Sequence, residues 1–378
     1  MKKKLLTSAV LLAFAVSSLA AFSWGGIVDN NSKMTANDDF SENRLKQSNG
    51  VYLFANTNIG QDGKLRFSAE GLYKYEFNAD FKEDESTFQN ILDVDLLKLS
   101  GSWAIADGKL SMSLGRFTFS DFSGSIFFQT SDGLFASYDS ARFKASAYAG
   151  YTGLLNRLNV SMTESEYEED EQIYALCPKY IPVLADFSYK VLFGSHTLGL
   201  QLAAFIPVSD DNDMKAYGTL IANGYIGTIA SYEAKISLGT EKFDGLMLDT
   251  LFDVNFYVNS NIMATAGIEY VSGENGDLKP FQTLTVRSYG NAPFYNGLIL
   301  PKLAAFYVKD KLYAGVTERI IVTMPEDEAK LDGFDTTVNV IYNLFSDLQL
   351  GCDAGVYICK EDKDFTSYFA TIKAKLAF

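Results

Sequence analysis

The sequence predicts an all-β fold: a transmembrane antiparallel up-and-down β-barrel of eighteen strands, with sixteen as the fallback count. Three observations support this prediction. Long segments alternate polar and apolar side chains, as a strand with two unlike faces does. Short turns and longer polar connections alternate along the chain. Beyond residue 20 there is no run of about eighteen apolar residues, so only a closed barrel would let this chain span a membrane.

The first twenty residues have the pattern of a secretory signal peptide. Three lysines, Lys2–Lys4, precede an apolar run from Leu5 to Leu19, and Ser18-Leu19-Ala20 provides a small-x-small cleavage site. No cysteine follows the apolar core, so the bacterial lipoprotein pattern is absent. We therefore expect export of the chain, cleavage after Ala20, and a single barrel domain over residues 21–378.

Alternation is clearest from Lys64 to Asn78. One face of this segment is polar or charged except for Leu72, whereas the other face carries no charge. Strands in soluble proteins most often have five or six residues, but the segments here have ten to fifteen, the length that a tilted membrane-spanning strand needs. The same alternation recurs in 141–152, 181–193, 197–207, 226–239, 246–258, 333–345 and 348–360.

The connections are of two kinds. Tight ones with turn residues are expected at 61–63, 106–108, 139–140, 194–195, 223–224, 259–260, 309–310 and 346–347. Longer ones are expected at 79–89, 119–130, 153–180, 209–214, 273–298 and 324–331. If the last strand ends in the periplasm, every tight turn lies on the periplasmic side. Parity then requires one more strand before 51–60, for which Ala21–Val28 is the candidate, with a first outer loop at Asp29–Asn49. Ala21–Val28 and Lys215–Ala222 are the two short and poorly patterned strands of the count.

The last segment, Phe365–Phe378, is a strand that ends the chain on an aromatic residue. Its alternate residues from Tyr368 to Phe378 form an apolar face, and Lys373 and Lys375 lie on the other face. Closure of the barrel requires this strand to pair with the start of the mature chain.

Signal peptide, amphipathic strands, alternating turns and loops, and the terminal phenylalanine together resemble the bacterial outer-membrane porins. The segment Leu114–Phe117, followed by Ser120-Asp121 and Asp132-Gly133, also resembles a strand–loop–strand element of some porin-like barrels. The resemblance implies an outer-membrane location, contact with membrane lipid, and passive diffusion of small hydrophilic solutes. It also implies that the barrel assembly machinery reads Phe378. It indicates no particular solute and leaves a homo-oligomer open.

Composition argues against several other functions. Without the three signal-peptide lysines, 29 basic residues stand against 47 acidic ones, a net charge of −18. This balance argues against nucleic-acid binding and suggests a weak preference for cations. His196 is the one histidine of the chain and lies beside an expected turn, and the cysteines lack metal-ligand spacing. We therefore expect no enzyme activity, no metal site and no cofactor.

Charged residues on the inward faces are the candidates for lining a pore, because sixteen to eighteen strands leave an aqueous channel. The apolar segment Phe119–Thr130 is the first candidate for folding into the lumen, and Gly153–Tyr180 is the second. An acidic run at 164–171 fits a solvated outer face, which leaves open a surface adhesin or receptor as the alternative function. The candidate lining residues are Arg66, Glu70, Lys74, Arg142, Lys144, Lys190, Glu233, Lys235, Asp249, Asp253, Arg319, Asp335, Asp353, Lys373 and Lys375.

The signal-peptide prediction is tested by expressing the whole chain in a Gram-negative host and sequencing the amino terminus of the membrane-bound product. We expect the product to begin at Ala21. A product that keeps Met1–Ala20 would contradict the prediction.

Overall fold

The computed structural model describes residues 22–60, 63–163, 175–209, 212–274, 277–292, 296–324, 328–360 and 365–378. The signal-peptide prediction and the acidic run at 164–171 fall outside these ranges. In the described residues, eighteen long strands and one two-residue strand, β14, form a single sheet. No helix among these residues has the length and apolar character needed to cross a membrane.

The long strands have between 9 and 21 residues. β7 is one residue shorter than the predicted ten to fifteen, and the others lie within that range or are longer. Their bounds are β1 Phe22–Asn37, β2 Asn43–Ile59, β3 Leu65–Asp80, β4 Glu85–Ile105, β5 Gly108–Ser120, β6 Phe128–Ser140, β7 Phe143–Tyr151, β8 Tyr180–Leu192, β9 His196–Pro207, β10 Lys215–Ile226, β11 Ala230–Glu241, β12 Asp244–Tyr257, β13 Ile262–Val271, β15 Leu298–Lys309, β16 Leu312–Thr323, β17 Lys330–Asn343, β18 Leu348–Cys359 and β19 Ser367–Ala377; β14 is Leu278–Lys279.

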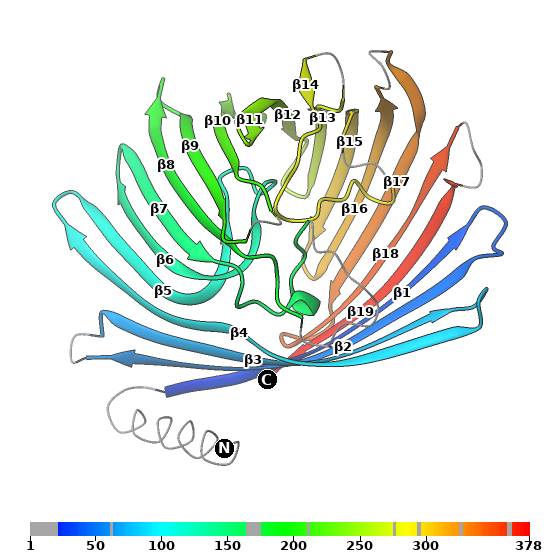
Figure 1. Cartoon of the computed structure of the whole chain (residues 1–378), viewed down its shortest axis with the longest axis horizontal. Helices are drawn as coiled ribbons and strands as arrows, with labels where there is room; N and C mark the ends of the chain where they lie inside the picture. Colours follow the sequence, from blue (N-terminus) through cyan, green and yellow to red (C-terminus); the bar gives the residue numbers. More distant parts are fainter. Residues whose placement is uncertain are drawn as a thin grey trace.

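Each long strand pairs antiparallel with its neighbours in sequence, and β19 pairs with β1, so the sheet closes on itself (Figure 1). The closing ladder runs from Ile27↔Ala377 to Asn37↔Ser367. Beyond it, Gly26 and Phe378 exchange two backbone hydrogen bonds of 2.9 Å. The predicted eighteen-stranded barrel, closed between the last strand and the start of the mature chain, is therefore confirmed.

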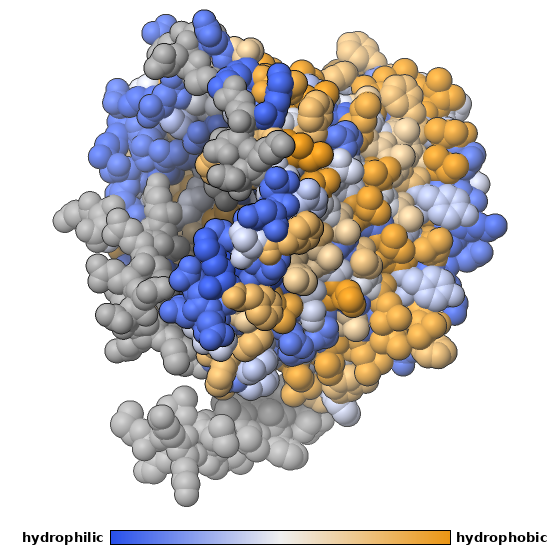
Figure 2. Space-filling model, turned by 90° about the vertical axis from the view of Figure 1, so that its right-hand side faces the viewer, coloured by the Kyte–Doolittle hydropathy of each residue, from blue (hydrophilic) through white to orange (hydrophobic). Residues whose placement is uncertain are grey.

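Side chains alternate between an apolar outer face and a polar inner face. In β17, Phe334 and Val338 are 38% and 42% exposed, whereas Asp335 between them is 0% exposed. Apolar side chains cover much of the right-hand part of the surface in Figure 2, and hydrophilic ones gather toward the left. An apolar outer surface is what a hydrocarbon environment requires of a barrel.

Two connections predicted as long outer loops are wrong. The segment Asp29–Asn49 is mostly strand, because β1 extends to Asn37 and β2 begins at Asn43; likewise β3 reaches Asp80 and β4 begins at Glu85. Above the apolar band both faces of a strand contact water, so a strand there needs no alternation of polar and apolar side chains. The strands therefore continue beyond the segments that alternation identifies. The predicted strands near Ala21–Val28 and Lys215–Ala222 are present as β1 and β10. Because β10 continues to Ile226, the tight turn predicted at 223–224 is wrong.

The wall departs from a regular ladder between β4 and β5. The 21-residue strand β4 pairs with β5 only from Leu97 to Ile105, although it pairs with β3 from Glu85 to Gly101. β5 leaves the wall at Gly115, whose φ is +116° and whose missing Cβ would lie 2.1 Å from the Leu97 carbonyl oxygen. Only glycine adopts this conformation without strain. Gly115 therefore starts the turn that takes the outer ends of β5 and β6 into the lumen.

Substitution of Gly115 by valine should destabilise the barrel by on the order of 1–3 kcal/mol, because it places a Cβ at positive φ against a backbone oxygen. Thermal unfolding of the detergent-solubilised barrel measures the effect. Gly218→Ala is the matched control, since its added Cβ would meet only Leu202 Cδ2 at 3.8 Å. Equal melting temperatures for the two variants would contradict this role of Gly115.

Candidate functional site

Three chain segments from the outer end of the barrel lie inside it and define the candidate site (Figure 1). We call them the β5–β6 segment (121–127), the β7–β8 segment (152–163 and 175–179) and the β13–β15 segment (272–274, 277–292 and 296–297). Each connects two adjacent long strands, and each packs against strands far from its own in sequence.

Asp121 organises the β5–β6 segment. Its buried carboxylate accepts hydrogen bonds from the backbone N–H groups of Ser123, Ile126 and Phe127 at 2.8–3.0 Å. The Asp121 N–H donates to the Phe127 carbonyl at 2.8 Å, which closes the turn. One carboxylate therefore satisfies three donors that an inward turn would otherwise leave unpaired.

The β5–β6 segment is attached to the opposite wall. The Phe122 N–H donates to Gln201 Oε1 of β9 at 3.0 Å, and Lys235 Nζ of β11 donates to Ser125 Oγ at 3.1 Å. The Phe127 ring is fully buried, 5.6 Å from the ring of Phe205 between centroids. The prediction that Phe119–Thr130 folds into the lumen is confirmed, and burial of its apolar side chains provides the driving force.

Arg287 anchors the β13–β15 segment. Its guanidinium pairs with Asp249 of β12 at 3.1 Å and with Glu269 of β13. Lys235 also pairs with Asp249 at 3.1 Å, so two cations neutralise a carboxylate that is 0% exposed. The Arg287 Cζ lies 5.0 Å from the centre of the Tyr289 ring. Burial raises the pKa of the Tyr289 hydroxyl, so this ring stays neutral beside the cation.

Asp335 of β17 holds the far end of the same segment. Its carboxylate accepts a hydrogen bond from the Asn291 N–H at 2.8 Å and pairs with Arg319 at 2.9 Å. A Cβ on Gly290 would lie 2.0 Å from Asp335 Oδ2, so the backbone approaches the carboxylate as closely as only glycine allows. The segment therefore spans from β12 and β13 to β17 across the barrel interior.

The three segments are joined to one another by backbone hydrogen bonds. The Ile126 carbonyl accepts from the N–H groups of Leu284 at 2.8 Å and Thr285 at 3.2 Å. From the β7–β8 segment, Thr163 N–H donates to the Leu284 carbonyl at 3.0 Å. The Ser161 carbonyl accepts from the Val286 N–H at 3.2 Å. The result is one connected layer of backbone across the lumen.

The sequence-predicted lining residues fall into groups. Lys235, Asp249 and Asp335 are 4%, 0% and 0% exposed, so these three hold infolded segments instead of facing open water. Other members form pairs along the inner wall: Lys302–Asp253, Lys373–Asp353, Lys74–Glu76 and Lys190–Asp139. Arg142 lies in the turn between β6 and β7, and Arg319 of β16 pairs with Asp335. The remaining five are on strands: Arg66, Glu70, Lys144, Glu233 and Lys375.

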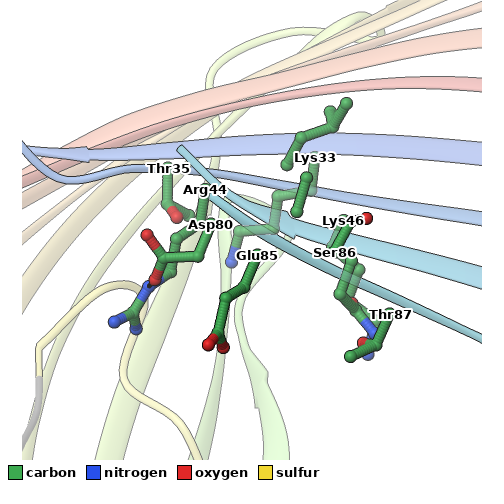
Figure 3. A pocket seen from close by; sticks show the side chains of 11 residues that line it. Lys33, Thr35, Arg44, Lys46, Asp80, Glu85, Ser86 and Thr87 are labelled. Carbon is green, nitrogen blue, oxygen red and sulfur yellow. Dashed lines mark hydrogen bonds and ion pairs between the residues drawn. The ribbon is translucent and has the colours of Figure 1, made fainter. Parts of the chain in front are cut away.

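Two cavities mark open space in the interior. One, of about 470 Å³, lies beside the joined segments and is lined by Thr163, Gln282, Thr283 and Arg287 among others. The second, of about 360 Å³, lies at the outer ends of β1–β4. There Arg44 and Asp80 pair at 2.8 Å, and the side chain of Glu85 points to the same side of the strands (Figure 3). Polar and charged groups of both signs line this space.

Sequence reasoning missed the role of the β13–β15 segment, which it treated only as a long connection. The sequence did contain one indication of infolding, because apolar and aromatic residues are unfavourable on a solvent-exposed loop. In the structure three of them, Phe281, Leu284 and Tyr289, are buried. The partners of Arg287, contributed by β12 and β13, have no local signature in the sequence. The second candidate for infolding, Gly153–Tyr180, is partly inside, with Asn159 Nδ2 donating to Asp95 Oδ1 at 2.6 Å.

Replacing Arg287 with alanine should release the β13–β15 segment, because Asp249 and Glu269 would lose a shared cation in a buried setting, a loss of about 3–5 kcal/mol for such pairs. We expect faster chymotryptic cleavage near Phe281 and Tyr289 in the folded barrel. Lys302→Ala is the control, since it breaks a wall-to-wall pair with Asp253. Cleavage of the two variants at the same rate would show that Arg287 does not hold the segment.

Comparisons with known proteins find similarity in structure alone. No family model matches the chain, and neither does any curated protein. The crystal structure of Pseudomonas aeruginosa OpdQ matches at 10% identity with a TM-score of 0.61, covering 94% of this chain and 98% of that one. OccK9 (OpdG) of the same species matches at 10% identity and 0.63, covering 96% and 99%. OpdK of that species, solved with vanillate, matches at 12% identity and 0.58, covering 94% and 99%.

These solved structures are OprD/Occ-type outer-membrane porins. The coverage is nearly complete in both directions, so the likeness extends to the whole barrel and is not limited to a shared motif. The chain therefore has the fold of the OprD/Occ porins, a closed antiparallel β-barrel of eighteen strands.

Proposed function

We propose that the protein is an outer-membrane porin, a passive channel for small hydrophilic solutes and ions. The observation that carries the proposal is the combination of an eighteen-stranded wall with a polar interior. A barrel of this size leaves space that wall side chains alone do not fill. The cavity of about 470 Å³ beside the joined segments, lined by apolar side chains such as Phe281 as well as by polar ones such as Gln282 and Arg287, supports open space at that level.

The infolded segments favour a narrow channel over a wide one. Backbone hydrogen bonds among residues 126, 161, 163 and 284–286 occupy part of the cross-section. Ion pairs on the inner wall, such as Lys302–Asp253 and Lys373–Asp353, give the channel a polar lining with charges of both signs. Among the predicted lining residues, those that are not buried under infolded segments are our candidates for contact with the solute.

The excess of acidic residues, 47 against 32 basic in the whole chain, favours a weak preference for cations. The alternative from another class is a surface adhesin or receptor whose acidic outer connections bind a partner. Conductance separates the two functions, because a binding barrel with a sealed lumen passes no current.

We expect the purified barrel, reconstituted into a planar lipid bilayer, to give stepwise openings that are stable in time. Under a potassium chloride gradient, the reversal potential should have the sign for cations. A silent bilayer with protein shown to be folded by its heat-dependent gel mobility would contradict the porin function. A reversal potential of the opposite sign would contradict only the predicted selectivity.

A further inference from the structure

The wall of the barrel has a seam where β4 loses its partner strand. From Glu85 to Leu96, β4 pairs only with β3 among the described residues, because β5 has turned into the lumen at Gly115. β6 likewise pairs with β7 only up to Asp132↔Tyr151. The tip of this hairpin, from Phe117 to Ser131, therefore lies inside, away from both neighbouring strands.

The β7–β8 segment fills the space that the hairpin leaves. It is folded back on itself by an isolated bridge between Asn156 and Leu176 and by the Cys177 N–H donating to the Leu155 carbonyl at 3.0 Å. Thr152 N–H donates to the Tyr180 carbonyl at 3.1 Å, which ties the segment to β8. On its other side, no ladder to β4 exists in the described residues. The edge of the segment next to β8 is thus held by backbone hydrogen bonds, whereas the edge next to β4 has no such ladder in the described residues.

Side chains hold this second edge. Arg116 donates to the Val94 carbonyl of β4 at 3.1 Å and to the Leu154 carbonyl of the segment at 3.0 Å. Its guanidinium also pairs with Asp132 at 2.8 Å and lies 3.5 Å from Asp93. The Val94 N–H donates to Asp93 Oδ1 at 2.7 Å, so both backbone groups of Val94 are satisfied by side chains.

Apolar side chains flank these polar contacts on both sides. Leu92 of β4 is 69% exposed, and Leu154 and Leu176 of the β7–β8 segment are 58% and 55% exposed. On the inner side, Leu96 packs against a buried cluster that includes Phe117 and Leu155. A solute that is unfavourable in a polar lumen would meet apolar surface on either side of the seam.

The position of the seam along β4 places it in the upper part and at the outer edge of the apolar band. Trp103 lies on the outer face near the tight-turn end, and a strand rises about 3.3 Å per residue at a tilt of about 40°. Leu97 and Leu92 then lie about 15 Å and about 28 Å above Trp103, against a band about 25 Å tall. With the tight turns in the periplasm, the Leu97 end of the seam falls in the outer leaflet, and Leu92 lies at the outer edge of that leaflet.

We propose that this seam, between residues 92–96 of β4 and residues 154–159 of the β7–β8 segment, is a lateral gate. It lets small amphipathic or uncharged aromatic solutes pass between the lumen and the outer leaflet. The inference rests on the proposed outer-membrane location but adds a second route to the proposed channel. The structure represents the closed state, with Arg116 as the positioning residue that keeps it closed.

The physical argument is the unequal cost of separation. Elsewhere in the wall, parting two strands within hydrocarbon exposes a row of backbone groups that have no water to bind. At the seam, parting breaks a few side-chain contacts, and Arg116 keeps Asp132 as a partner. The seam is therefore the place in the described wall where the barrel opens at lowest cost.

A reversible cross-link tests the gate. The pair Asp95→Cys/Asn159→Cys replaces two side chains whose polar tips lie 2.6 Å apart across the seam. The background carries Cys177→Ala, Cys352→Ala and Cys359→Ala to exclude other pairings. Intact cells of a porin-deficient Gram-negative host report the entry of N-phenyl-1-naphthylamine, an uncharged probe that fluoresces once it reaches the lipid.

We expect the reduced form to speed probe entry several-fold over cells without the barrel, and oxidation to abolish the gain, with recovery in dithiothreitol. Ion conductance of the purified barrel should stay the same in both forms. The control pair Asn255→Cys/Thr265→Cys, across the regular β12–β13 ladder, should leave probe entry unchanged when oxidised. As a second variant, Arg116→Gln in the native background should speed probe entry further.

The proposal would be overturned if the reduced barrel gave no faster entry, or if entry were equal in the reduced and oxidised forms. It would also be overturned if the folded pair failed to cross-link, or if oxidation of the control pair abolished entry as well. Conductance that is lost on oxidation would overturn it too, because the seam would then belong to the axial path. A failure of the porin function itself would instead show as absent conductance in every variant.

Discussion

Hydrogen bonding of the backbone within the apolar band is the constraint on which the rest of the structure depends. With no water available, each N–H and C=O group of a membrane-spanning wall needs a partner in the protein. The antiparallel ladder from β1 to β19, closed by Gly26 and Phe378, meets this need along nearly the whole circumference. Where the ladder stops, in the outer half of β4, the side chains of Arg116 and Asp93 bind the backbone groups of Val94.

The inward turn of β5 and β6 links the wall to the candidate site. Gly115 allows the turn, Asp121 satisfies the donors at its tip, and the exposed gap is filled by the β7–β8 segment. The apolar side chains that enter the lumen, such as Phe127, then form a core inside the barrel. The inward turn of β5 and β6 therefore both narrows the lumen and leaves the irregular seam in the wall.

Buried charge is used to fix the segments in place. Asp249 and Asp335 are each 0% exposed, and each joins a wall cation to an infolded segment. A carboxylate in such a position is costly unless it is paired and hydrogen-bonded, so these contacts favour one arrangement of the segments over looser alternatives.

The sequence predicts the barrel well because its signals are local. Alternation from Lys64 to Asn78 and tight turns such as Ser346-Asp347 depend on neighbouring residues alone, and they suffice for the strand number and closure. The outer ends of β1 and β2 could not be predicted, because strands above the band need no alternation. The partners of Arg287 lie 18 and 38 residues away in sequence, and nothing local indicates them. Infolding of Phe119–Thr130 was predictable from its apolar content, but its contact with Leu284 was not.

The central claim is that three segments are joined by backbone hydrogen bonds inside the barrel. Hydrogen–deuterium exchange of the detergent-solubilised protein measures this directly at the amides of Leu284 and Val286, which donate to Ile126 and Ser161. The account predicts that these amides exchange as slowly as those of the adjacent strands β12 and β13. Exchange as fast as in the exposed connection at residues 38–42 would contradict it.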